Sequence, residues 1–204
     1  VHHEHIADGI NLDLAGGAID IQTVVIGGTA LADGNTFTNN ARGVDILVVS
    51  DAWSPQISGV VVTLHNTMRE LERMGHTVAT ITSDVFRTIP CPTYPEIRLS
   101  LFPDAEVGRQ IEAFAPDAIH IATEGPLGLA ARRHALRTGR SFTTAYHTQF
   151  PEYVHARCRL PLRVSYRWMR WFHAPAAALM VATPDIERRL AASGFTHLVR
   201  WSRG

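Results

Sequence analysis

The sequence has no lysine, so its 19 basic residues are all arginines, and 19 acidic residues balance them to a formal net charge of zero. A neutral chain without a basic groove is not typical of nucleic-acid binding, and no nucleic-acid partner is expected. No apolar run approaches the roughly 18 residues of a transmembrane helix. The N-terminus lacks the basic start and apolar stretch of a secretory signal. The two cysteines lack CxxC spacing, which indicates a reducing compartment and a cytoplasmic location.

Two phosphate-binding motifs are also missing. The absence of GxGxxG weakens an interpretation as a nicotinamide-dependent oxidoreductase, and the absence of GxxxxGK[ST] disfavours a P-loop. With 46% apolar and 19% charged residues in 204, the composition is typical of a globular domain with a buried core.

The chain changes character near residue 43. Residues 1–43 hold five acidic residues and one arginine, and they are rich in glycine, aspartate and asparagine. Short apolar alternations there predict strands, with turns around residues 16–17, 27–28 and 33–34. We expect an irregular N-terminal extension over 1–43, of unknown role, and a separate domain over 44–204.

From residue 44, apolar runs of strand length alternate with amphipathic helical segments. Helices are predicted over 59–74, 104–114, 125–137, 160–173 and 184–192, and strands over 44–49, 76–81, 97–101, 118–121, 142–146 and 178–182. Residues 197–201 are predicted to be a strand or a linker. The proline-rich residues 90–95 are predicted to be a connection. This alternation is typical of the α/β class and predicts a doubly wound parallel sheet.

Ligands of an open parallel sheet bind at the carboxyl ends of its strands, so the loops there are candidate sites. Gly59 ends the first loop, and a glycine there would let the N–H groups of the next helix meet a phosphate. The alternative is that Gly59 only permits a tight turn.

Two further loops carry polar candidates. Glu124 and Gly125 precede a predicted helix, where Glu124 either binds sugar hydroxyls or interacts with the positive end of the helix. His147 directly follows a strand, at the place where polar side chains meet substrate, with a structural role as the alternative.

The predicted helix over 160–173 is basic and aromatic. Arg159, Arg163, Arg167 and Arg170 share one face, and aromatic residues including Trp171 cover much of the rest. Such a helix can lie in an anionic membrane interface. An ordinary core helix with a solvated arginine face is the alternative.

Several runs together resemble the N-terminal half of glycosyltransferase family 4, in particular bacterial lipid α-mannosyltransferases and sulfoquinovosyltransferase-like proteins. In chain order they are VVSDAW (48–53), SGVVVTL (58–64), ELERMGH (70–76), PDAIHIATEGPLG (116–128), YHTQFPEY (146–153) and WSRG (201–204). The resemblance covers residues 44–204 and implies the acceptor-side, Rossmann-like domain of a GT-B fold, whose active site lies in a cleft between two domains. The family usually has asparagine at the position of Ser58.

The resemblance also implies roles for the candidate residues. His147 is expected to be catalytic, beside the transferred sugar. The other candidates are loop residues, for the donor phosphates Ser58, Gly59 and Val60, and for the acceptor or the sugar Asp51, Glu124 and Gly125. Family members use a nucleotide-sugar and usually no metal, so GDP-mannose or a UDP-sugar is the expected substrate, without cofactor or metal ion.

Two functional hypotheses follow. The first is a domain of a retaining hexosyltransferase that moves mannose, glucose or a similar sugar to a lipid or glycan acceptor, at the inner face of the plasma membrane. Because the sequence lacks the C-terminal donor-binding half that the resemblance calls for, the chain alone is expected to be inactive. The alternative is a non-catalytic module on the same fold that binds a membrane surface or a partner.

Overall fold

A six-stranded sheet forms the centre of the protein in the computed structural model, which describes residues 10–15, 18–26, 35–38, 43–54, 58–91, 94–147 and 161–201. All neighbouring strands are parallel, in the order β11-β10-β9-β8-β4-β5. The strands are β4 (Asp45–Ser50), β5 (Thr77–Thr82), β8 (Ala118–Ile121), β9 (Thr143–Tyr146), β10 (Ala178–Val181) and β11 (Leu198–Arg200).

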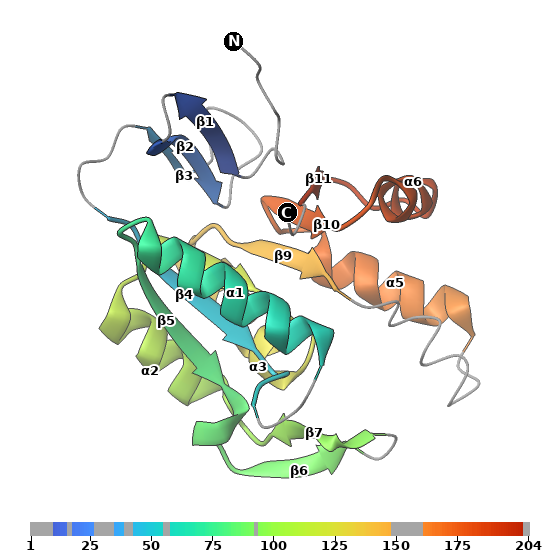
Figure 1. Cartoon of the computed structure of the whole chain (residues 1–204). Helices are drawn as coiled ribbons and strands as arrows, with labels where there is room; N and C mark the ends of the chain where they lie inside the picture. Colours follow the sequence, from blue (N-terminus) through green and yellow to red (C-terminus); the bar gives the residue numbers. More distant parts are fainter. Residues whose placement is uncertain are drawn as a thin grey trace.

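Helices cover the two faces of this sheet (Figure 1). They are α1 (Gly59–Arg73), α2 (Asp104–Phe114), α3 (Pro126–Thr138), α5 (Leu162–His173) and α6 (Pro184–Ala192). Helix α1 lies on one face, and α2 and α3 lie on the other. The predicted doubly wound, Rossmann-like sheet is confirmed. No helix among the described segments is long and apolar enough to cross a bilayer.

Strand β4 is buried on both faces, which explains its continuous apolar run. Ile46 and Val48 pack in one cluster with Leu64 of α1. Leu47 and Val49 point to the opposite face and pack in a second cluster, to which α2 and α3 contribute. Since β5 pairs with one edge of β4 and β8 with the other, the chain reverses its winding direction between β4 and β8. This reversal creates the crevice where open α/β sheets bind ligands.

The predicted helices and the strands of the main sheet agree with the structure to within two residues at each end. Local signals explain this agreement. The Ser58 hydroxyl accepts a hydrogen bond from the Val61 N–H at 3.3 Å and caps α1. Gly139, with a φ of 69°, ends α3 in the left-handed conformation that glycine favours.

The region after β5 differs from the prediction. Residues 90–95 were expected to form a connection and 97–101 a strand, but β6 (Thr88–Cys91) and β7 (Tyr94–Ser100) form an antiparallel two-stranded ribbon outside the main sheet. The prolines are compatible with this ribbon because a two-stranded sheet has only edge strands, where a missing N–H is tolerated.

The N-terminal segment contains three strands. Strands β1 (Ile10–Ala15), β2 (Ala18–Ile26) and β3 (Asn35–Thr38) form an antiparallel sheet, with residues 16–17 between the first two strands. The short strands that the sequence pattern predicted are present at this place. The description of residues 1–43 as an irregular extension of unknown role stays a prediction.

Candidate functional site

The predicted site residues gather at one edge of the main sheet. Because β4, β8 and β9 are parallel neighbours in the sheet, their carboxyl ends lie at the same edge. The loop after β4 leads to Gly59 at the start of α1, the loop after β8 leads to α3, and His147 directly follows β9 (Figure 1).

Asp51 joins the two loops on either side of the crevice. Its carboxylate accepts hydrogen bonds from the Leu127 N–H at 2.9 Å, the Gly128 N–H at 3.3 Å and the Thr123 hydroxyl at 3.0 Å. The Thr123 oxygen in turn accepts from the Asp51 N–H at 2.7 Å. The N-cap residue of α3 is Gly125, which has no side chain. Asp51, in the loop directly after β4, supplies the capping carboxylate instead.

Two glycines allow this close approach. A Cβ atom on Gly125 would lie 2.4 Å from Cγ of Asp51, and one on Gly128 would lie 1.9 Å from the carbonyl oxygen of Thr123. Asp51 is only 5% exposed. The contacts within the chain therefore give Asp51 and Gly125 a role in supporting the loops, and their expected contacts with the acceptor or the sugar stay predictions.

Burial raises the pKa of Asp51 from 3.8 to about 6, because loss of hydration outweighs the stabilisation of the charged carboxylate by Leu127, Thr123 and Gly128. Folding therefore favours the protonated acid. Between pH 3.8 and about 6, this residue's contribution to stability falls as the pH rises.

Asp51→Asn is expected to remove this dependence, because the amide is uncharged throughout. Relative to the wild type, the variant should gain about 2–3 kcal/mol in free energy of unfolding between pH 4 and pH 7. Urea denaturation across that range measures the difference. A variant that instead loses stability relative to the wild type as the pH rises would show that the hydrogen bonds to the carboxylate outweigh its dehydration.

Glu124 belongs to a chain of polar groups that connects α3, α5 and β9. Its carboxylate lies 3.3 Å from Nε2 of His173, at ion-pair distance, and both side chains are largely buried. The other ring nitrogen of His173 lies 2.9 Å from the hydroxyl of Thr144. His173 of α5 thereby helps to hold the Glu124 side chain in place. The expected contact of Glu124 with sugar hydroxyls stays a prediction.

His147 lies beside an aromatic ring and a second histidine. Its ring meets that of Trp201 edge to face, with centroids 5.9 Å apart. The backbone N–H of Trp201 donates to the carbonyl of Val181 at 2.8 Å, and this hydrogen bond holds Trp201 in place beyond the end of β11. On β8, His120 lies 2.9 Å from the Thr143 hydroxyl. Burial, and then the electrostatic interaction with His147, lower the pKa of His120 to about 3, so His120 stays neutral near pH 7.

The start of α1 has the features of an anion site. Gly59 is the first residue of the helix, and nothing lies within 4 Å of the position that a Cβ atom would take. Among the residues that the structure describes, the glycines with positive φ are Gly75, Gly139 and Gly194, so Gly59 is not explained by a left-handed turn. Within the part of the chain that the structure describes, no acceptor meets the N–H groups of Gly59 and Val60. Open N–H groups at a helix N-terminus favour phosphate.

The described arginines of the basic face of α5 are exposed, and the expected membrane contact stays a prediction. They are Arg163, Arg167 and Arg170. Arg170 also donates to the carbonyl of Ser193 at 2.7 Å and so supports the end of α6. Trp171 is 50% exposed and stacks against the guanidinium of Arg132 at 4.0 Å. Arg159, like residues 148–158, lies outside the described residues.

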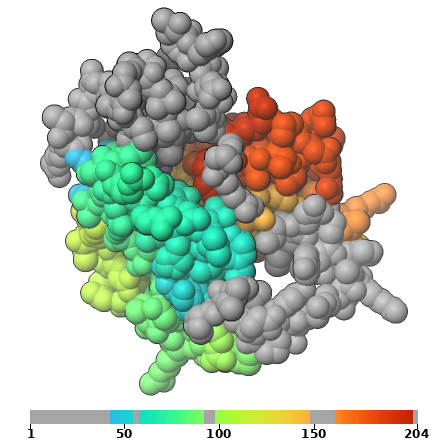
Figure 2. All heavy atoms as spheres, in the orientation of Figure 1, coloured from blue at the N-terminus to red at the C-terminus, as the bar shows by residue number. Residues whose placement is uncertain are grey.

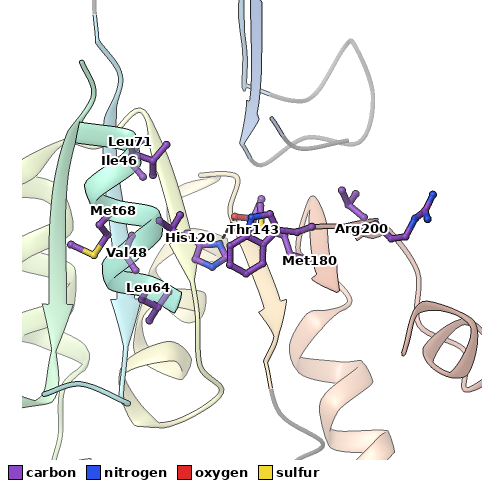
Figure 3. Close-up of a pocket in the computed structure, with 12 residues that line it drawn as sticks. Ile46, Val48, Leu64, Met68, Leu71, His120, Thr143, Met180 and Arg200 are labelled. Carbon is purple, nitrogen blue, oxygen red and sulfur yellow. Dashed lines mark hydrogen bonds between the residues drawn. The ribbon is translucent and has the colours of Figure 1, made fainter. Parts of the chain in front are cut away.

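A pocket of about 60 Å³ lies on the α1 face of the sheet between α1 and β11 (Figure 3). It is mostly apolar, and His120 and Thr143 lie near its middle. Ile46 and Thr143 line it near the amino ends of β4 and β9, and Trp201, whose ring contacts that of His147, lines it toward the carboxyl edge. No group of three or more metal-ligating side chains occurs in the described ranges.

Comparisons with known proteins agree with this arrangement. The family model of Glycosyltransferase Family 4 matches residues 57–204. A GDP-mannose-dependent alpha-mannosyltransferase of Mycobacterium tuberculosis (strain CDC 1551 / Oshkosh) is 24% identical over 79% of this chain and 48% of its own length. The sulfoquinovosyl transferase SQD2 of Arabidopsis thaliana is 28% identical over 72% of this chain and 32% of its own.

An alpha-monoglucosyldiacylglycerol synthase of Acholeplasma laidlawii is 33% identical over 57% of this chain and 33% of its own length. The chain thus spans about half of the mycobacterial relative and about a third of the other two. The family match covers well over half of the chain. The chain therefore belongs to glycosyltransferase family 4.

Proposed function

We propose that this chain is the acceptor-side domain of a retaining hexosyltransferase that moves a sugar from a nucleotide-sugar to a lipid. The observation that carries this proposal is the position of α1's open N-terminus and of His147 at one edge of the sheet. Family membership supports sugar transfer, and the names of the relatives support a mannose, sulfoquinovose or glucose donor and a lipid such as a diacylglycerol.

The leaving group explains why a helix start is needed. When the glycosidic bond of the donor breaks, negative charge develops on the nucleoside diphosphate. The N–H groups of Gly59 and Val60, at the positive end of α1, would stabilise that charge without moving. Ser58 already uses its hydroxyl to cap the Val61 N–H, so we assign it to holding the helix start in place. No metal ion or cofactor is required for this task.

His147 would act on the sugar. Its ring is positioned by Trp201, and a ring nitrogen beside the transferred sugar can hold a hydroxyl group in the orientation that the reaction needs. The proposed donor is GDP-mannose or a UDP-sugar, and its base would be held by a second domain. We therefore propose that residues 1–204 alone do not turn over. Arg163 and Arg167 would add a peripheral contact with anionic lipid at the inner face of the plasma membrane.

Transfer of labelled sugar tests this proposal. The full-length protein is incubated with GDP-mannose, UDP-glucose or UDP-sulfoquinovose and with diacylglycerol-containing vesicles, and the lipid fraction is analysed. We expect one donor to give a glycolipid whose anomeric configuration by NMR is that of the donor, and no product from residues 1–204. Folded full-length protein without transfer from any donor would contradict the proposal, and an inverted product would contradict retention.

A further inference from the structure

The β6–β7 ribbon has one face with Thr88 and Ser100, which is buried at Ser100, and one face with Ile89 and Leu99, which is exposed at Ile89. Thr88 pairs with Ser100, and Ser100 is only 4% exposed, so this face lies against the body of the protein. Ile89 pairs with Leu99 on the opposite face, and Ile89 is 46% exposed. A ribbon that only shielded the core would have the reverse arrangement, with its apolar face inward.

Large apolar side chains continue this surface. Leu101 follows β7, is 38% exposed, and donates its N–H to the Arg87 carbonyl at 2.8 Å. The next residue, Phe102, is 92% exposed and has a φ of 49°. A bulky residue in the left-handed region is rare and costs about 1–3 kcal/mol. Val85, at the end of the short helix η1 (Ser83–Val85) that contacts β7, is 65% exposed.

Arg87 lies at the start of the ribbon, and Arg98 lies on the ribbon face opposite to Ile89 and Leu99. Both side chains are exposed, and Arg98 donates to the hydroxyl and the carbonyl oxygen of Thr88. Neither arginine has a carboxylate partner in the described segments, and the nearby Asp84 carboxylate accepts from the Thr82 hydroxyl. This combination of apolar and basic side chains fits a lipid surface, where apolar side chains can contact the acyl chains and guanidinium groups can contact the phosphates.

The ribbon also stands at a suitable place. It follows the carboxyl end of β5, at the same edge as the start of α1 (Figure 1). In the space-filling view, the green surface around β6 projects from the lower end of the molecule (Figure 2). Any surface that met the ribbon would therefore lie beside the edge that carries Gly59 and His147.

We propose that Ile89, Leu99, Leu101 and Phe102 form a lipid-insertion face, which enters the acyl region of a bilayer and holds the carboxyl edge of the sheet at the membrane surface. This inference rests on the proposed transfer to a lipid, because it explains how an acceptor embedded in a bilayer reaches the site. It assigns membrane attachment to apolar insertion at this ribbon, in addition to the charge of α5.

Vesicle flotation of this chain tests the lipid-insertion face. The wild type is expected to bind vesicles of phosphatidylcholine alone, and to stay bound at high salt, since apolar insertion is not screened. Phe102→Asn should lower the partition coefficient about tenfold, because a phenyl ring is lost from the acyl region. Asparagine tolerates the left-handed backbone, so the fold should be kept, which circular dichroism and urea denaturation check.

Two control variants separate the alternatives. Leu136→Asn removes a side chain that is 47% exposed on α3, away from the ribbon, and should change binding less than twofold. The double variant Arg163→Gln, Arg167→Gln measures how much of the binding to phosphatidylglycerol-containing vesicles depends on the charge of α5. Wild-type binding that requires anionic lipid and is unaffected by Phe102→Asn would overturn the inference, as would no binding at all. Flotation needs no donor sugar, so this result is independent of whether sugar transfer is found.

Discussion

His147→Ala in the full-length protein is expected to lower kcat by more than tenfold, a loss of at least about 1.4 kcal/mol of transition-state stabilisation. The ring follows β9 at the carboxyl edge, and its edge packs on Trp201. Truncation would remove the group that orients the sugar but leave the buried strand intact, so the free energy of unfolding should fall by only about 1 kcal/mol. Steady-state kinetics with the donor identified by the transfer assay, together with urea denaturation, measure both effects.

The matched control is Trp201→Phe, which keeps an aromatic ring against His147 and should lower kcat much less. If His147→Ala retained near-normal kcat while folded, the histidine would be a structural group and the catalytic assignment would be lost. A loss of kcat that merely followed a loss of folded protein would have the same meaning.

A pair of glycine variants is expected to give opposite results. Gly59→Ala should change the free energy of unfolding by less than about 0.5 kcal/mol, since the new methyl group meets nothing within 4 Å and alanine suits a helix. It should raise the KM for the nucleotide-sugar at least about tenfold in the full-length protein, because the methyl group would stand between the helix N-terminus and the diphosphate.

Gly128→Ala should do the reverse. Its methyl group would lie 1.9 Å from the Thr123 carbonyl oxygen, so the backbone must shift, at about 3 kcal/mol of stability and several degrees of melting temperature. Urea and thermal denaturation of both variants give the comparison. Normal donor affinity in Gly59→Ala would mean that nothing approaches this glycine closely, and the phosphate assignment would fail.

The sheet could be predicted because its signals are local. Strand β4 shows an unbroken apolar run since it is buried on both faces, and α1 starts at a serine that caps it. The β6–β7 ribbon could not be predicted in the same way. Its prolines at 90 and 95 indicate a break. They are tolerated because no other described strand pairs with either edge of the ribbon, which is a tertiary property.

The candidate site was predictable in position but not in its supporting contacts. The strand-then-loop pattern placed His147 and Gly59 at one edge of the sheet. The capping of α3 by Asp51 joins residues 76 and 77 positions apart, and the approach of His173 to Glu124 joins α5 to the loop before α3. Gly125 and Gly128 partly indicated the contact with Asp51, because glycines close together at a helix start let another side chain approach the backbone.

The most direct test is a structure of the full-length protein with an intact or non-hydrolysable nucleotide-sugar bound. We expect the diphosphate within hydrogen-bonding distance of the N–H groups of Gly59 and Val60, and the transferred sugar beside the His147 ring. A donor bound with its diphosphate away from the start of α1, for example in the apolar pocket between α1 and β11, would contradict the assignment of the site.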